Sequence, residues 1–190
     1  MSAEFDIARA NMLESQVRTA DVTDLSIQEA IRLSPRHELT PSGRAHLAYA
    51  DTEIEYAPGL WMLKPRDIAK LLQGLLPVAG ESALAIAAPY GAMLLRQIGL
   101  QVTEIGASEG LPIRGGGFDL AISEGAVGAI PTAWIDALVI GGRLGVVVRE
   151  GPVGRAMRVL RTQDGVGTRT LFDATPPFMD GFEPKASFAF

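Results

Sequence analysis

The sequence predicts an α/β protein: a doubly wound, mostly parallel sheet with an N-terminal helical cap and a C-terminal β-hairpin. The second half of the chain contains short, almost continuous apolar runs, which read ALAIAA, LQVTEI, FDLAISEGA and RLGVVVRE. Such runs are typical of parallel strands that are buried on both faces of a sheet. Helix-like segments alternate with them, and this alternation favours crossover connections between parallel strands.

The first 80 residues are predicted to form the cap and a lead-in helix. Apolar residues in FDIARANMLESQVRT form an imperfect helical stripe, and a second helix over LSIQEAIRL has Asp24 or Ser26 as its cap. The polar, turn-rich stretch that follows is expected on the surface, with a short helix near Gly43 to Leu47. Proline at position 65 and a row of leucines then predict a helix that Pro77 ends.

Two more helices and a hairpin are predicted among the strands. One helix over YGAMLLRQIG ends at Gly99, and another over PTAWIDALVIGG runs from Pro131 to Gly141. Strand-like runs on both sides of Asp164-Gly165 indicate the hairpin. Because no linker or repeat divides the chain, we expect one domain over residues 1–190, with 1–80 as cap and lead-in and 81–190 as sheet core.

Composition argues against several classes of partner. The formal net charge is −5, which gives no general attraction for nucleic acid or an anionic membrane. No window approaches the ~20 apolar residues of a membrane span, and the N-terminus lacks a secretory signal pattern, so we expect a cytoplasmic protein. There are no cysteines and only two histidines, so no metal site is expected and His37 is placed on the surface.

The carboxyl ends of the predicted strands are where a ligand is expected, because open parallel sheets bind ligands there. Glu124 lies at one such end and is the candidate for a general base or a ligand-holding carboxylate. The alternative is that it caps a helix or pairs with an arginine. The glycines at 115–117 fit a short loop better than a phosphate-binding nest.

Seven stretches, in consistent order, resemble the protein-L-isoaspartate O-methyltransferase family, particularly its shorter bacterial branch. They are RANMLESQVRTADVTD, SPRHEL, AYAD, GLWMLKPRDIAKLLQGL, ISEGAVGAIP, GGRLGVVV and LFDATPPFMDGF. The resemblance implies a shortened Rossmann-like methyltransferase fold with a helical cap over the sheet. It also implies S-adenosylmethionine as cofactor and methylation of an isoaspartyl carboxyl in a damaged protein as the reaction.

The sequence departs from this family at the loop that binds the cofactor. Matched to the family's pattern, the acid of the first strand becomes Ala85, and the first two loop glycines become Ala87 and Pro89. Only Gly91 remains of the three glycines. A proline removes an amide donor as well as a flexible position, so backbone approach to a cofactor is hindered.

Further departures fall on the rest of the same cleft. The acid expected after the second strand matches Gly106, and Glu104 is displaced to another phase of the strand. The segment 105–118 is too short for the helix and strand that the family has there. The hydroxyl that the family places before Pro65 in the substrate loop is replaced by Lys64.

These departures predict a pseudoenzyme: a non-catalytic relative without a bound cofactor that acts through a protein partner or as a homo-oligomer. The alternative is an active S-adenosylmethionine-dependent carboxyl methyltransferase whose rebuilt site uses Glu124 and Tyr90, since such catalysis is mostly alignment. A third interpretation is that another ligand occupies the cleft. Charged residues of the N-terminal segment are expected to fasten the cap to the sheet; they are Arg9, Arg18, Asp21 and Asp24.

Overall fold

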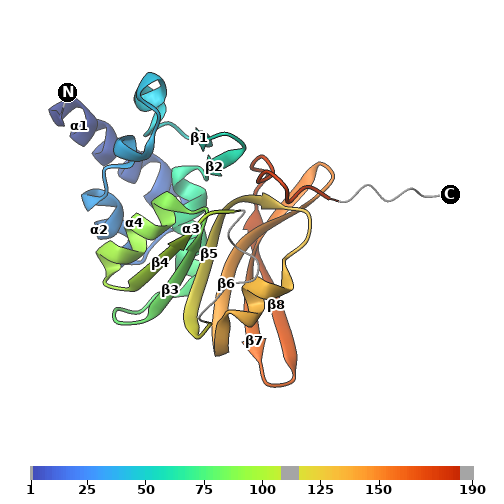
Figure 1. Ribbon diagram of the computed structural model, residues 1–190. Coiled ribbons are helices and arrows are strands. Elements are labelled where there is room, and N and C mark those ends of the chain that lie inside the picture. Colours follow the sequence, from blue (N-terminus) through green and yellow to red (C-terminus); the bar gives the residue numbers. More distant parts are fainter. Residues whose placement is uncertain (1, 108–115, 185–190) are drawn as a thin grey trace.

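The computed structural model describes residues 2–107 and 116–184 and contains a six-stranded sheet with the order β4-β3-β5-β6-β7-β8 (Figure 1). Four neighbouring strands are parallel, and β7 and β8 join them as antiparallel partners. The prediction of a mostly parallel sheet with a C-terminal hairpin is therefore confirmed. The strands are β3 (Ser82–Ile86), β4 (Gln101–Ile105), β5 (Phe118–Val127), β6 (Leu138–Glu150), β7 (Val153–Thr162) and β8 (Gly165–Asp173).

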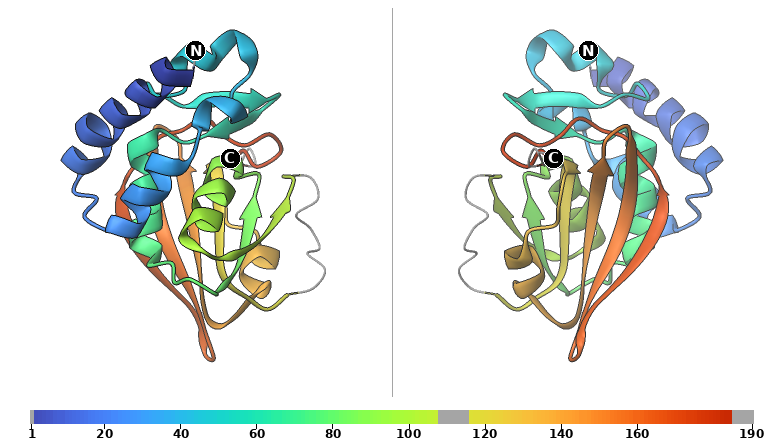
Figure 2. Two further views of the ribbon diagram at one scale, coloured as in Figure 1. Left: turned by 90° about the vertical axis from the view of Figure 1, so that its left-hand side faces the viewer. Right: turned by 90° about the vertical axis from the view of Figure 1, so that its right-hand side faces the viewer.

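The helices are unevenly distributed over the two faces of this sheet. Helices α3 (Pro65–Leu75) and α4 (Pro89–Ile98) pack on one face, and α2 (Leu25–Leu33) packs on both of them from outside (Figure 2). The cap continues with α1 (Ser2–Met12), a π-helical turn (Leu13–Val17) and 3₁₀ turns (Arg18–Ala20, Arg36–Leu39, Ser42–Leu47). On the opposite face the structure has the short α5 (Thr132–Asp136).

Local signals explain where most helices begin and end. Asp24 caps α2, because its side chain accepts hydrogen bonds from the amides of Ser26 and Ile27, as one of the two predicted caps. Helix α3 begins at Pro65 as predicted. Helix α4 ends at Gly99, whose φ of +103° suits a residue without a Cβ atom.

The helix predicted from Pro131 to Gly141 is wrong in its second half. The helix ends at Asp136, and β6 begins at Leu138, which pairs with Phe118. The residues after Leu138 include Val139 and Ile140, which favour an extended backbone. Pairing with β5 therefore decides the conformation of this segment.

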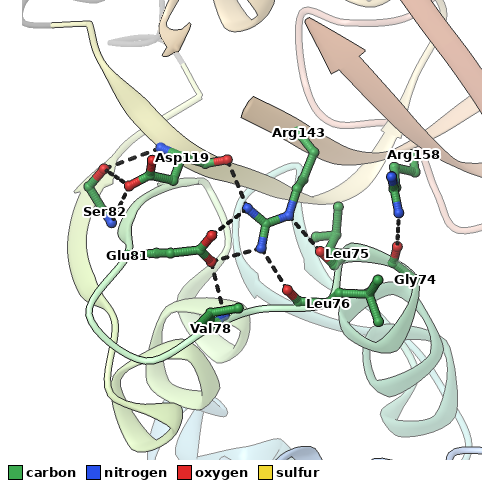
Figure 3. Close-up of polar contacts among 9 residues, drawn as sticks. All are labelled: Gly74, Leu75, Leu76, Val78, Glu81, Ser82, Asp119, Arg143 and Arg158. Carbon is green, nitrogen blue, oxygen red and sulfur yellow. Dashed lines mark hydrogen bonds and ion pairs between the residues drawn. The ribbon is translucent and has the colours of Figure 1, made fainter. Parts of the chain in front are cut away.

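An arginine holds α3 against the amino ends of the strands (Figure 3). The Arg143 guanidinium donates to the carbonyl oxygens of Leu75 and Leu76 at the end of α3, at 2.6 and 2.7 Å. It also binds both carboxylate oxygens of Glu81 at 2.7 and 2.8 Å and the carbonyl of Asp119 at 3.2 Å. This cluster satisfies carbonyls that a helix end leaves without an internal partner.

The carboxyl ends of the strands are covered by two other segments. The ribbon of β1 (Ile54–Ala57) and β2 (Leu60–Met62) contacts β5, and the C-terminal segment forms a bridge between Phe178 and Ala126. The amide of Asp180 donates to the carbonyl of Gly59 at 3.0 Å, which ties the two covers together. Within residues 2–107 and 116–184, every helix is too short or too polar to span a bilayer.

Two expectations for the cap need correction. His37 is partly buried and not fully exposed: its ring stacks on that of Phe5 with the ring centres 4.1 Å apart, and its Nδ1 lies 2.7 Å from the Tyr49 hydroxyl. The two arginines of the N-terminal segment form contacts within the cap, Arg9 with Asp6 and Arg18 with Glu14 and Gln28. The side chain of Gln73 fastens the cap instead, through the backbone of Asp21, Thr23 and Asp24.

Candidate functional site

The loop after β3 has a backbone conformation at position 87 that suits glycine, although the residue there is alanine. Ala87 has a φ of +44°, in the left-handed region, and its amide donates to the carbonyl of Ile105 at 2.8 Å. This region costs an L-residue about 1–2 kcal/mol. The loop therefore combines a conformation typical of glycine with a side chain that disfavours it.

The amino terminus of α4 has no free backbone donor in its first turn. Pro89 has no amide hydrogen, and the amides of Tyr90 and Gly91 both donate to Oε1 of Glu124, at 3.0 and 2.8 Å. The amide of Ala92 donates to the carbonyl of Ala88 at 2.8 Å. A helix amino terminus normally offers such donors to an anion. Here the anion is a side chain of the protein itself.

The Glu124 carboxylate is completely buried and joins three parts of the fold. Its other oxygen, Oε2, accepts the amide of Leu63 at 2.9 Å, and its exposed fraction is 0%. Burial raises the pKa of the Glu124 carboxyl above its ordinary value, while the Arg36 guanidinium and the three amides favour the charged form. The carboxylate therefore links β5 to α4 and to the segment before α3.

Arg36 completes this link from the side of the cap. Its Nη2 donates to the carbonyl of Leu63 at 2.7 Å, so the backbone of a single residue connects Arg36 to Glu124. The guanidinium is fully buried and lies 4.7 Å from the centre of the Tyr90 ring. Its Nε and Nη1, like the Tyr90 hydroxyl, have no hydrogen-bond partner among the described residues. The result is a buried polar cluster without access to solvent.

The other predicted site residues do not lie together at one site. Ala85 is buried in the core, and Glu104 is half exposed and pairs with Arg96 on α4 at 2.6 Å. Lys64 caps α3 without a side-chain hydrogen bond to it, and its Nζ lies 3.6 Å from Glu53. The predicted loop at 115–117 falls partly outside the described residues, which resume at Gly116.

A hollow remains near the carboxyl end of β4. It has a volume of about 560 Å³ and lies between the turn that joins β1 to β2, residues Gly106 and Ala107, and the segment from Asp180 to Phe182. Its walls are mainly apolar, and Asp180 is the ionisable residue that lines it. Among the described residues, those that line the hollow include none of α4.

The amides at the start of α4 are already bonded within the protein. A cofactor carboxylate at this loop would need free amides, and Glu124 already uses the two at the start of α4. A second carboxylate there would also meet the charge of the first in a buried setting. Among the described residues, no group of three or more acidic, histidine or cysteine side chains could hold a metal ion.

Sequence reasoning missed Arg36 and Asp180. Arg36 stands in the SPRHEL stretch beside His37, and its charge suggested exposure, since arginine is rarely fully buried. Asp180 stands about 75 residues from Gly106 in the chain, although both line one hollow. No local sequence pattern predicts the burial of Arg36 or the place of Asp180 in the hollow.

Comparison with known proteins gives consistent matches, although no family model matches the chain. The chain is 27% identical to protein-L-isoaspartate O-methyltransferase 1 of Pelobacter propionicus, over 85% of this chain and 89% of that protein. It is 27% identical to the protein-L-isoaspartate O-methyltransferase of Methylibium petroleiphilum, over 88% and 75%. The corresponding protein of Methylorubrum populi is 28% identical, over 84% and 87%.

Two solved structures share the fold. One is a Plasmodium falciparum protein assigned as a protein-L-isoaspartate O-methyltransferase, in complex with S-adenosyl-L-homocysteine. It matches with a TM-score of 0.69 and 15% identity, over 90% of this chain and 97% of that one. Another protein-L-isoaspartate O-methyltransferase matches with a TM-score of 0.71 and 16% identity, over 91% of this chain and 66% of that one.

Proposed function

In sequence and in fold this chain is a relative of the protein-L-isoaspartate O-methyltransferases, and we propose that it has lost their cofactor site and acts by binding other molecules. Because a protein with a similar fold was solved with S-adenosyl-L-homocysteine, this compound and S-adenosylmethionine are the ligands to test. One observation carries the proposal. The Glu124 carboxylate takes the amides of Tyr90 and Gly91, which are the donors that an anionic ligand would need.

Three further features support the proposal. Pro89 supplies no amide, and Ala87 adds a methyl group in a turn whose φ of +44° suits glycine. Glu124 and the Tyr90 hydroxyl, which an active enzyme with a rebuilt site would use, are both fully buried. A group that substrate cannot reach cannot take its proton, because proton transfer needs hydrogen-bond distance.

Calorimetric titration with S-adenosylmethionine and S-adenosyl-L-homocysteine tests the proposal. We expect no saturable heat at concentrations that would detect a dissociation constant of about 100 μM. An isoaspartyl peptide, incubated with S-adenosylmethionine beside an active family member as a positive control, should remain unmethylated. Saturable binding of either compound, or methylation above the protein-free rate, would overturn the proposal.

A further inference from the structure

A groove runs between α3 and strand β8. It consists of two hollows of about 310 and 470 Å³ between α3, the 3₁₀ turn after α1, and strand β8. The hollows share four lining residues, so they form one continuous depression; these are Ala20, Asp21, Lys70 and Phe172. Figure 2 shows α3 beside the β7–β8 edge of the sheet.

One end of this groove is basic. Arg158 of β7 and Arg169 of β8 line it and are direct cross-strand partners. Like charges in such a position destabilise a sheet. Arg158 is partly compensated, because its Nη1 lies 3.4 Å from the carbonyl oxygen of Gly74 at the end of α3. Within the described residues, neither arginine forms an ion pair with an acid.

The other end is acidic. Asp51, Asp67 and Asp173 line it together with one cation, Arg66, which lies 3.2 Å from Asp51 and 3.6 Å from Asp67. Asp173 forms no ion pair among the described residues. The formal charges leave an excess of two acids here and an excess of two arginines at the other end.

The centre of the groove is close to neutral and partly apolar. Lys70 and Asp21 line both hollows, and their formal charges cancel. The Lys70 ammonium lies 4.8 Å from the centre of the Phe172 ring, which provides a flat apolar floor. Leu76 adds an exposed apolar side chain at the basic end.

From these contacts we propose that the groove binds an extended segment of a partner protein that is acidic at one end and basic at the other. The direction of the groove is set by β8, along which Arg169 lies at the basic end and Asp173 at the acidic end. Four residues of a strand span about 13 Å, so about four extended partner residues reach from the basic end to the acidic end. β8 is the last strand on this side, and edge strands favour extended partners.

The inference goes beyond the proposed loss of the cofactor site and does not depend on it, because the groove shares no residue with the Glu124 cluster. A protein that methylates peptides and one that does not would present the same groove. Failure of one proposal therefore leaves the other standing.

The test compares three fluorescent peptides of equal composition by anisotropy. Two carry a block of four glutamates and a block of four lysines, in the two chain orders, and the third alternates the same residues. We expect one block peptide to bind at least about tenfold more tightly than the alternating peptide, and raised salt to weaken that binding. Equal binding of block and alternating peptides would overturn the proposal, because binding would then not depend on how the charges are arranged along the peptide.

Two variants with the same change of charge locate the binding. Arg169→Glu should remove most of the preference for the block peptide. Arg32→Glu, which alters an exposed arginine of α2 outside the groove, should keep it. Circular dichroism checks that both variants fold. Equal loss in both variants, or tighter binding of a single-stranded oligonucleotide through the same arginines, would also contradict a peptide groove.

Discussion

The two ends of the central sheet show how differently one fold can use charge. At the amino ends, Arg143 and Glu81 form a bidentate ion pair near the surface, and the arginine also binds the carbonyls that end α3. At the carboxyl ends, Glu124 is fully buried and takes amides that begin α4. The first arrangement completes a helix end, whereas the second occupies amides that the amino terminus of a helix would otherwise offer to an anion.

The largest effect should come from removing the buried carboxylate. Glu124→Ala leaves the amides of Leu63, Tyr90 and Gly91 without an acceptor and the Arg36 guanidinium without a counter-charge. Each buried polar group left without a partner costs about 1–3 kcal/mol, so the loss of the acceptor for three buried amides should cost at least about 3 kcal/mol in total. Urea denaturation should show a loss of this order in the free energy of unfolding.

The control for this variant is an exposed glutamate of a neighbouring strand. Glu150 lies at the end of β6 and is exposed, so Glu150→Ala should change the free energy of unfolding by less than about 0.5 kcal/mol. If Glu124→Ala were as mild as Glu150→Ala, the carboxylate would not be the link between α4, β5 and the cap that the geometry indicates.

The amino-end cluster should respond less strongly. Arg143→Ala removes the hydrogen bonds to Leu75, Leu76 and Glu81, but water can reach part of the site, because the Arg143 side chain is 12% exposed and that of Glu81 is 22% exposed. We expect a loss of about 1.5–3 kcal/mol, in the range of hydrogen bonds to charged groups. A loss greater than that of Glu124→Ala would reverse the comparison between the two ends.

The sequence predicted the architecture and the position of the loop between β3 and α4, because both depend on local patterns. Apolar runs, Pro65 and Gly99 each act within a few residues, and the strands and helices that they predict are present. The use of Glu124 depends on Leu63, Tyr90 and Gly91 meeting at one point, which only the packed fold brings about. The prediction of a helix from Pro131 to Gly141 was wrong in its second half for a similar reason, because pairing with β5 makes that part a strand.

A smaller effect is expected in the loop after β3, at the carboxyl ends of the strands. Ala87→Gly relieves a φ of +44° but adds freedom to the unfolded chain, so the net gain in the free energy of unfolding should be about 0.5–1 kcal/mol. The melting temperature should rise accordingly. Because Glu124 still holds the α4 amides, binding of S-adenosyl-L-homocysteine should stay absent. A fall in the melting temperature would show that the left-handed conformation does not strain Ala87.

The subtlest difference between the two ends is the sign of their response to pH. The hydrogen bond from Arg143 holds the pKa of Glu81 below its ordinary value of 4.5, so the stability that this carboxylate contributes is present above pH 4.5 and is lost as the pH falls through the lowered pKa. Burial raises the pKa of Glu124 above 4.5, so the folded protein holds that proton more tightly than the unfolded chain does. Its contribution to stability is therefore present below pH 4.5 and declines as the pH rises through the raised pKa.

Urea denaturation measured from acidic to neutral pH tests both signs. In Glu81→Gln the free energy of unfolding should no longer fall for this reason as the pH becomes acidic. In Glu124→Gln it should no longer fall for this reason as the pH rises above 4.5. The same sign of change in both variants would mean that the two carboxylates share one kind of environment, against the contrast between the ends of the sheet.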